Sequence, residues 1–393
     1  LGCLACHRVG NRGGAGVLAA PDLSQVGRRR SPAWLATWLK DPALLNRDHR
    51  MPVFVLSDAE RTQLVLALSA LGGPFSGRSI KGRPEQVRRG EELVKAAECA
   101  RCHRLPIETV ASSTKRNDLF RVPADWSGSC LDETPDRERW RPAAGGKLSR
   151  SQREAVRAFV VSRSNTGLSP RSAFDRGRWV LEQRNCLTCH PRGTARGNTA
   201  LAGETSKQVA ILKGQSQALI PPSLTSVGDK LVDEALVRAI AGRQKRVRLP
   251  WLKTRMPRFE HTSQDSQALA TFLVASDRIP AGAPATPRVA ARPRDESMLV
   301  LGQELVGAKG FSCIACHRVG TYVPRNVALG TRGSDLANLA GRLRREYFLR
   351  WCRSPLRIVP GMEMPSYIKA VPGLLGESAD RQLSATWDAL NDS

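Results

Sequence analysis

The sequence of 393 residues has no long apolar run, few aromatic residues and too few acidic residues to balance its basic ones. A membrane-spanning helix needs about 20 consecutive apolar residues, and no segment approaches that length, so we expect no transmembrane segment. Aromatic residues make up 5% of the chain. Large rings therefore supply little of the protein core.

The charge of the chain is strongly positive, because 61 lysines and arginines stand against 36 aspartates and glutamates and give a formal net charge of +25. One interpretation is a solvated basic surface. The other is steering toward an acidic partner or an anionic surface, because a field of one sign raises association rates. No nucleic-acid-binding motif accompanies the charge, so we do not expect nucleic acid as a partner.

Cysteine and histidine are scarce outside one repeated motif, Cys-x-x-Cys-His. Four copies hold eight of the ten cysteines and four of the six histidines, namely Cys3-Cys6-His7, Cys99-Cys102-His103, Cys186-Cys189-His190 and Cys313-Cys316-His317. The motif attaches c-type haem. Two cysteines one helical turn apart can reach both vinyl groups of a porphyrin, and the adjacent histidine then binds the iron. One copy would also fit half of a zinc site, whereas four copies predict four covalently bound haem c groups.

The spacing of the motifs predicts several small domains, because their first cysteines are 96, 87 and 127 residues apart. We predict four domains, over residues 1–75, 85–165, 171–280 and 296–393. Domains of this size bury limited apolar surface. A haem in each would act as a large core element and a covalent staple, in keeping with the low aromatic content.

An amphipathic helix is predicted before three of the four motifs, over residues 86–97, 174–182 and 298–306. The first motif has no such helix, since the sequence starts two residues before Cys3. We expect that another segment replaces this helix or that the chain begins further upstream. A secretion signal would also lie upstream.

A second repeated block contains a helix followed by Met-Pro. Ser31 and Pro32 predict the start of a helix with one apolar face. This face consists of Trp34, Leu35, Trp38 and Leu39, and in the last domain of Tyr347, Phe348, Trp351 and Cys352. We expect the tryptophans to pack in the core or against haem. Met-Pro follows at residues 51–52, 256–257 and 364–365, and Ser57 with Glu60 predicts the capping box of a final helix.

The order of these features resembles class I cytochrome c. The shared features are the haem motif near the start, a turn such as Pro21-Asp22-Leu23, and a later Met-Pro. The resemblance covers the first, third and fourth domains well and the second in part. It implies a mostly α-helical chain of four tandem small cytochrome c-like domains, each folded around one covalent haem, with an N-terminal helix packed against a C-terminal helix.

The resemblance also implies the axial ligands. The implied methionine ligands are Met51, Met256 and Met364, opposite His7, His190 and His317, while His103 is the proximal ligand of the second haem. Ligation by histidine and methionine fills both axial positions, so such a haem passes electrons and binds small molecules poorly. In the family a proline carbonyl accepts a hydrogen bond from the proximal histidine. The matching positions are Pro21 in the first domain, Pro221 or Pro222 in the third, and Ser334 or a neighbour in the fourth.

The second domain departs from the pattern, because no methionine lies between residues 51 and 256. Three explanations compete for its iron. The iron is five-coordinate and open to a small ligand or peroxide, or a residue of the same domain binds it, or a histidine from a neighbouring domain reaches it. The candidate ligands are Lys147 and Cys130 within the domain and His49 and His261 from its neighbours. For the last cysteine, Cys352, we expect a buried thiol, with a Cys130–Cys352 disulfide as the alternative.

We therefore predict a tetrahaem c-type cytochrome that carries electrons between redox partners outside the cytoplasm, in the periplasm or an equivalent compartment. Its expected partners are redox proteins with acidic docking surfaces. One alternative is a haem enzyme, a peroxidase or small-molecule reductase, with its open site at the second haem. An enzyme is disfavoured because no distal acid–base group stands out in that domain. The other alternative is an electron-transfer subunit of a larger membrane-associated redox complex.

Overall fold

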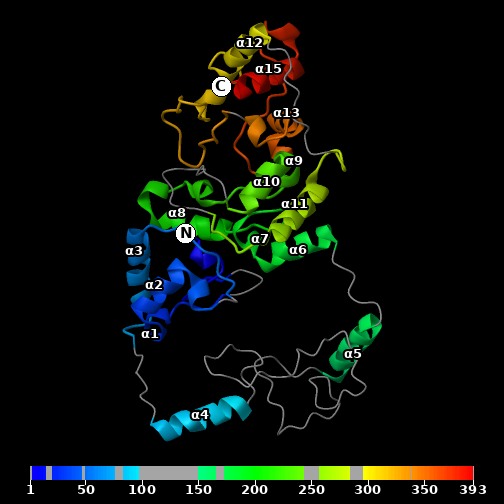
Figure 1. The fold of residues 1–393 in the computed structure, drawn as a ribbon. Helices are drawn as coiled ribbons and strands as arrows, with labels where there is room; N and C mark the ends of the chain where they lie inside the picture. The colour runs from blue at the N-terminus through cyan, green and yellow to red at the C-terminus, as the bar shows by residue number, and fades with distance from the viewer. Residues whose placement is uncertain are drawn as a thin grey trace. The chain divides into compact units, whose positions relative to one another are not determined.

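The chain is mostly α-helical, as predicted, in the part that the structure describes (Figure 1). The computed structural model describes residues 2–14, 20–46, 49–75, 83–96, 149–164, 172–242, 256–283, 295–337 and 339–392. Within these residues the strands form one short antiparallel ladder, β1 (Arg8–Val9) with β2 (Arg12–Gly13). None of the described helices is long and apolar enough to span a bilayer.

The chain divides into two compact units. The larger unit joins Leu1–Gly77 to Ser172–Ser393, and the smaller unit is Arg78–Arg171. The smaller unit contains helices α4 (Pro84–Ala96) and α5 (Arg150–Ser164). The second Cys-x-x-Cys-His motif lies outside the described residues, as do Cys130 and Lys147.

The larger unit contains three helical modules, each with its own hydrophobic core. We call residues 2–75 the N-terminal module, residues 172–283 the central module and residues 295–392 the C-terminal module. Their cores fall within three of the four predicted domains. The three modules share one order of corresponding elements. In each, the motif turn is followed by a short helix, a second helix and a final helix.

The N-terminal module comprises η1 (Cys3–Ala5), α1 (Val26–Arg29), α2 (Pro32–Lys40), η2 (Pro42–Leu44) and α3 (Asp58–Ser69). Ser31 caps α2 by accepting a hydrogen bond from the backbone N–H of Trp34. Ser57 and Glu60 form the predicted capping box of α3. The core of this module is Leu35, Leu39 and Val65, so α2 and α3 pack face to face as their apolar patterns require.

The central and C-terminal modules are larger. The central module contains α6 (Ala173–Gln183), α7 (Cys186–Cys189), α8 (Thr199–Gln208), η4 (Ala210–Leu212), η5 (Ser216–Leu219), α9 (Val227–Lys230), α10 (Asp233–Ile240) and α11 (Ser263–Asp277). The C-terminal module contains α12 (Glu296–Val306), η6 (Cys313–Ala315), η7 (Leu339–Gly341), α13 (Arg345–Arg353), α14 (Pro355–Ile358), η8 (Leu375–Glu377) and α15 (Ala379–Asn391).

In both larger modules the helix before the motif crosses the last helix at very short range, α6 on α11 and α12 on α15 (Figure 1). The crossing points are glycines. A Cβ atom at Gly177 would lie 2.1 Å from the carbonyl oxygen of Ala268, and one at Gly302 would lie 2.2 Å from that of Ala385. Only a residue without a side chain allows this approach, so these glycines bring the two ends of each module together.

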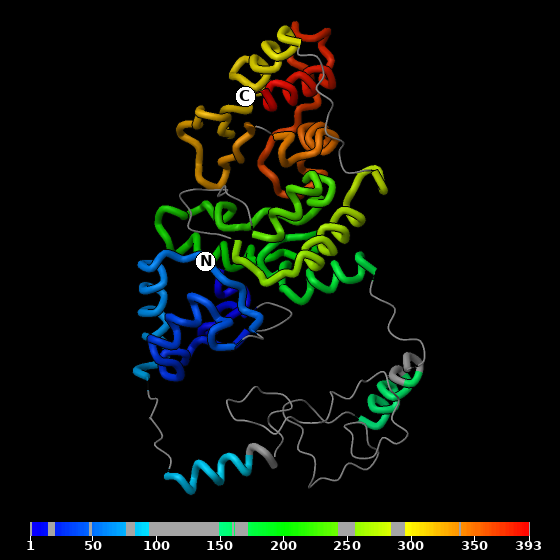
Figure 2. Tube along the Cα trace, in the orientation of Figure 1, coloured from blue at the N-terminus to red at the C-terminus, as the bar shows by residue number. Residues whose placement is uncertain are grey.

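The three modules are in direct contact. An antiparallel bridge joins Val53 of the N-terminal module to Arg258 of the central module, and another joins Leu231 of the central module to Leu343 of the C-terminal module. Figure 2 shows the blue N-terminal residues against the central module, which in turn contacts the C-terminal module. These contacts between residues distant in sequence hold the first, third and fourth motifs in one compact unit.

Candidate functional site

The three described Cys-x-x-Cys-His motifs fold into the same turn. In each, the backbone N–H of the histidine donates to the carbonyl of the first cysteine, with N–O distances of 2.9 to 3.0 Å. The residue before the first cysteine has a positive φ in all three, 78° at Gly2, 52° at Asn185 and 59° at Ser312. The turn places both cysteines and the histidine at the edge of one cavity.

The imidazole of each motif is held by a backbone carbonyl. The Nδ1 atoms of His7, His190 and His317 lie 2.7 to 2.8 Å from the carbonyl oxygens of Pro21, Pro222 and Ser334. Because a carbonyl can only accept, Nδ1 carries a proton, and in the neutral imidazole Nε2 then keeps its lone pair. This arrangement orients a histidine for metal ligation. The resemblance implied Pro21 as the first acceptor, and Pro222 and Ser334 are among the positions that it left open for the other two.

A repeated backbone hydrogen bond fixes the position of those carbonyls. The N–H of Leu23 donates to the carbonyl of Arg8, directly after the first motif, at 2.8 Å. Leu224 with Pro191 and Leu336 with Arg318 repeat this bond at the same distance. In each case the leucine follows the carbonyl that holds the histidine by two residues. The Pro-Asp-Leu-like turn therefore positions the imidazole of its own motif.

The methionines of the Met-Pro pairs face the same cavity as the histidines. In two modules the methionine has a tryptophan partner, because Trp38 Nε1 lies 3.0 Å from the Met51 sulfur and Trp351 Nε1 lies 2.8 Å from the Met364 sulfur. In the central module the position equivalent to Trp38 on α10 is Ala239. The sequence predicted the tryptophans only as packing residues. The sequence does contain a pattern that could have indicated their hydrogen bonds to methionine. In both modules the tryptophan lies thirteen residues before the methionine.

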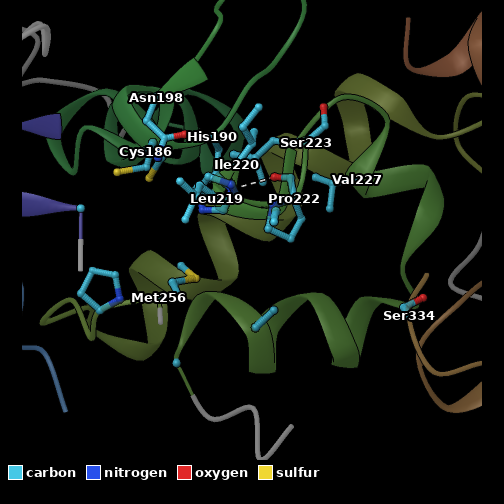
Figure 3. Close-up of a pocket in the computed structure, with 18 of the residues that line it drawn as sticks. Cys186, His190, Asn198, Leu219, Ile220, Pro222, Ser223, Val227, Met256 and Ser334 are labelled. Carbon is cyan, nitrogen blue, oxygen red and sulfur yellow. Dashed lines mark hydrogen bonds between the residues drawn. The ribbon is translucent and has the colours of Figure 1, made fainter. Parts of the chain in front are cut away.

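One continuous cavity of about 2860 Å³ runs through the three modules. An ordinary ligand pocket is roughly 300–1,000 Å³, so the volume corresponds to about three such pockets. All twelve predicted attachment and ligand residues of these modules line it, namely Cys3, Cys6, His7, Met51, Cys186, Cys189, His190, Met256, Cys313, Cys316, His317 and Met364. Figure 3 shows the third motif, with the hydrogen bond from His190 to Pro222 dashed and Met256 at the same pocket.

Most of the charged residues that line the cavity are basic. Among the described residues it includes ten arginines and one lysine but only two aspartates and one glutamate. The basic residues are Arg28, Arg29, Arg30, Arg50, Arg184, Lys230, Arg238, Arg258, Arg318, Arg332 and Arg342. Such a lining favours a ligand with an apolar body and anionic groups at its edge.

Burial raises the pKa of several of the described motif thiols. Burial raises the pKa of Cys186 to about 12 and that of Cys313 to about 11. Burial, followed by the nearby thiols of Cys6 and Cys3, raises the pKa of Cys189 to about 11. A zinc site needs thiolates, and across the described ranges no group of three or more Cys, His, Asp or Glu residues is placed to hold a metal ion. Neutral thiols at an apolar cavity suit attachment to a porphyrin better.

The other two histidines belong to the larger unit, His49 two residues before Met51 and His261 five residues after Met256. The side chain of His49 is 2% exposed, its Nδ1 lies 2.9 Å from the carbonyl oxygen of Met51, and its Nε2 lies 3.3 Å from the Glu260 carboxylate. His261 packs beside Phe259. Burial, followed by the charge of Arg184, lowers the pKa of His261. Their predicted role as ligands of the second haem stays a prediction, as do the roles of Cys99, Cys102 and His103.

Of the two cysteines outside the motifs, the described one, Cys352, has the predicted environment. Cys352 is a free thiol, 4% exposed, in the core of the C-terminal module. Burial raises its pKa well above the ordinary value. The thiol therefore acts as a small apolar core residue.

Comparisons of the chain with known protein families, with characterised proteins and with solved structures found no match. The functional interpretation therefore depends on the motifs and on the threefold repetition of their geometry.

Proposed function

We propose that the chain is a multihaem c-type cytochrome that carries electrons between redox partners outside the cytoplasm. In this proposal it consists of four class I cytochrome c-like domains, each with one covalent haem. The observation that supports it most strongly is the combination found in all three described motifs. Each histidine has its Nδ1 bonded to a carbonyl, and its cysteines and one methionine line the same cavity.

The residues divide into three roles. The cysteine pairs would hold haem through thioether bonds, with Cys99 and Cys102 doing so in the second domain. The histidine Nε2 and the methionine sulfur would bind the iron. A bound haem iron would supply one-electron chemistry, gaining or losing a single electron. The arginines of the cavity would neutralise the haem carboxylates, and the apolar lining would exclude water.

Electron transfer fits the geometry better than catalysis. In the three described modules a histidine and a methionine are available for each iron, so no axial position is left for a substrate. A carrier needs no acid–base residue at the iron, and its rate depends on haem packing and partner docking. The formal charge of +25 supports docking to acidic redox proteins, either free or as parts of a membrane-associated complex.

The experiment is expression of the full chain in a host that attaches c-type haem, followed by intact-mass measurement. We expect the mass of four haems on the wild-type chain and of three on the Cys313→Ala/Cys316→Ala variant. Cys352→Ala is the matched control, since this cysteine lies outside the motifs, and it retains four. A wild-type chain with fewer than three haems would contradict the proposal.

A second measurement separates the carrier from the haem enzyme. We expect the absorption spectrum of the haems in the first, third and fourth domains to be low-spin and unchanged by carbon monoxide. A carrier in which the second haem also has two protein ligands binds no carbon monoxide at all. Uptake of one equivalent by the second haem, together with turnover of peroxide or a small oxidant, would favour the enzyme instead.

A further inference from the structure

The order of the modules in space differs from their order along the chain. Sequence order places the second motif between the first and the third. In the larger unit, the N-terminal module contacts the central module and the central module contacts the C-terminal module. We propose that the haem sites of the first, third and fourth domains form a relay in that order, with the third as its middle member. This inference rests on the proposed function.

The first junction joins the two methionine loops. The N–H of Val53 donates to the carbonyl of Arg258 at 2.8 Å, and the N–H of Arg258 donates to that of Val53 at 2.7 Å. Each residue lies two positions after a proposed ligand, Met51 or Met256. The two loops therefore pair antiparallel through equivalent residues, so the methionine sides of both sites meet at one junction.

A second contact at this junction involves His49, two residues before Met51. Its Nε2 atom reaches across to the central module and lies 3.3 Å from the Glu260 carboxylate. The residues of the first and third sites line the same continuous cavity.

The second junction joins the central and C-terminal modules through a buried acid. The Asp229 side chain, 2% exposed, pairs with Arg344 and, at 2.5 Å, with Arg350. Backbone hydrogen bonds flank the Leu231–Leu343 bridge, from Val232 to Arg342 and from Arg344 to Lys230, both 3.0 Å long. These contacts fix the register of α9 against α13.

The central module also reaches the ligand environment of the fourth site. The ammonium group of Lys230, at the end of α9, lies 5.8 Å from the centre of the Trp351 ring. Trp351 donates to the sulfur of Met364. A residue of the third domain therefore contacts the tryptophan that holds a proposed ligand of the fourth, and the two sites are linked through packed side chains.

The relay needs no bond changes. One electron passes from a ferrous site to its ferric neighbour, so the first is oxidised and the second is reduced by one electron. A one-electron donor protein at one end and a one-electron acceptor protein at the other complete the balance. The fixed junctions keep neighbouring sites together, which makes transfer between them intramolecular.

The arrangement is tested by engineered disulfides in the full chain. Hydrogen-bonded and non-hydrogen-bonded antiparallel pairs have Cα separations of about 5.5 and 4.5 Å, which a disulfide can span. Val53→Cys/Arg258→Cys and Leu231→Cys/Leu343→Cys should each give one cross-linked peptide by mass spectrometry without reductant. Val300→Cys/Arg258→Cys is the control, with Val300 on an exposed face of α12, and should not cross-link. Failure of either bridge pair to cross-link would overturn the proposed order.

The relay is tested by electron paramagnetic resonance of variants lacking one haem. Cys186→Ala/Cys189→Ala removes the third haem, and Cys313→Ala/Cys316→Ala removes the fourth. Loss of the third haem should abolish the spin–spin broadening of the first and fourth ferric signals, while loss of the fourth should leave the broadening of the first in place. The relay is wrong if loss of the third haem changes neither signal or only one, or if loss of the fourth removes the broadening of the first. Intact mass is measured first, so an absence of haem would contradict the proposed function rather than the order.

Discussion

Trp38 and Met51 are joined by a hydrogen bond in which the indole N–H donates to the thioether sulfur, with an N–S distance of 3.0 Å. Trp351 and Met364 form the same bond at 2.8 Å. The two pairs occupy equivalent places in the N-terminal and C-terminal modules, where the tryptophan lies on the helix before the methionine loop. In the proposed haem sites, a donor on the sulfur lone pair would make the methionine a weaker ligand for ferric iron, so both bonds should favour the reduced haem.

We therefore expect Trp38→Phe to lower the reduction potential of the first haem and Trp351→Phe to lower that of the fourth. A net hydrogen bond contributes about 0.5–1.5 kcal/mol, which is roughly 20–60 mV for a one-electron couple. We expect the potential to fall by no more than this amount. Spectroelectrochemical titration of the full chain measures it.

Trp34→Phe is the matched control, because Trp34 stacks on Trp38 at 5.0 Å between ring centres without a hydrogen bond to the methionine. It should leave the potential of the first haem nearly unchanged. An equal shift in both variants would mean that ring packing, and not the hydrogen bond, sets the potential.

The helix crossings depend on the absence of a side chain at Gly177 and Gly302. We expect Gly177→Ala and Gly302→Ala each to destabilise their module by about 1–3 kcal/mol, because the added methyl group would overlap a backbone carbonyl of the last helix. Gly203→Ala, within α8, has open space around the new methyl group. This control should be stabilised by up to about 1 kcal/mol. Denaturant unfolding followed by circular dichroism distinguishes the three variants.

Asp229 joins the central module to the C-terminal module through its ion pairs with Arg344 and Arg350. Asp229→Asn leaves the buried Arg344 with only the half-exposed Glu346 carboxylate, 3.7 Å away, and removal of one partner of a buried pair costs about 3–5 kcal/mol. Asp380→Asn breaks an ion pair to Arg353 in which the carboxylate is 72% exposed, and such pairs contribute about 0–1 kcal/mol. Limited proteolysis between the central and C-terminal modules should accelerate in the first variant and not in the second. Equal rates would show that Asp229 does not hold the junction.

Local signals in the sequence predicted local structure well. The serine caps at residues 31 and 57 and the hydrogen bond from His7 to Pro21 depend on neighbouring residues or on a short motif, and all are present. The contact between Val53 and Arg258 was not predictable, because two residues about 200 positions apart carry no pattern that pairs them. The environment of His49 was likewise not predictable, because its burial beside Met51 depends on packing between distant parts of the chain.

Acid sensitivity of the central module should trace to Asp265, at the start of α11. Burial raises the pKa of Asp265, but hydrogen bonds from Arg176 and Thr262 together lower it by more. The pKa in the folded protein therefore lies below the ordinary value of 3.8. A depressed carboxyl pKa stabilises the fold above pH 3.8, and this stabilisation is lost as the pH falls through the folded pKa. Asp265→Asn should therefore be less stable than wild type at pH 7, by about 1–3 kcal/mol for a charged hydrogen bond.

The difference between wild type and Asp265→Asn should stay constant from pH 7 to about pH 5 and then shrink in more acidic solution, because the wild-type carboxylate becomes protonated. Denaturant unfolding at several pH values measures it. Asp58→Asn is the control, since this carboxylate pairs with Arg61 but is 96% exposed, and its effect should be small throughout. A difference for Asp265→Asn that does not shrink in acid would mean that the carboxylate charge contributes nothing, and that α11 depends on the shape of the cap alone.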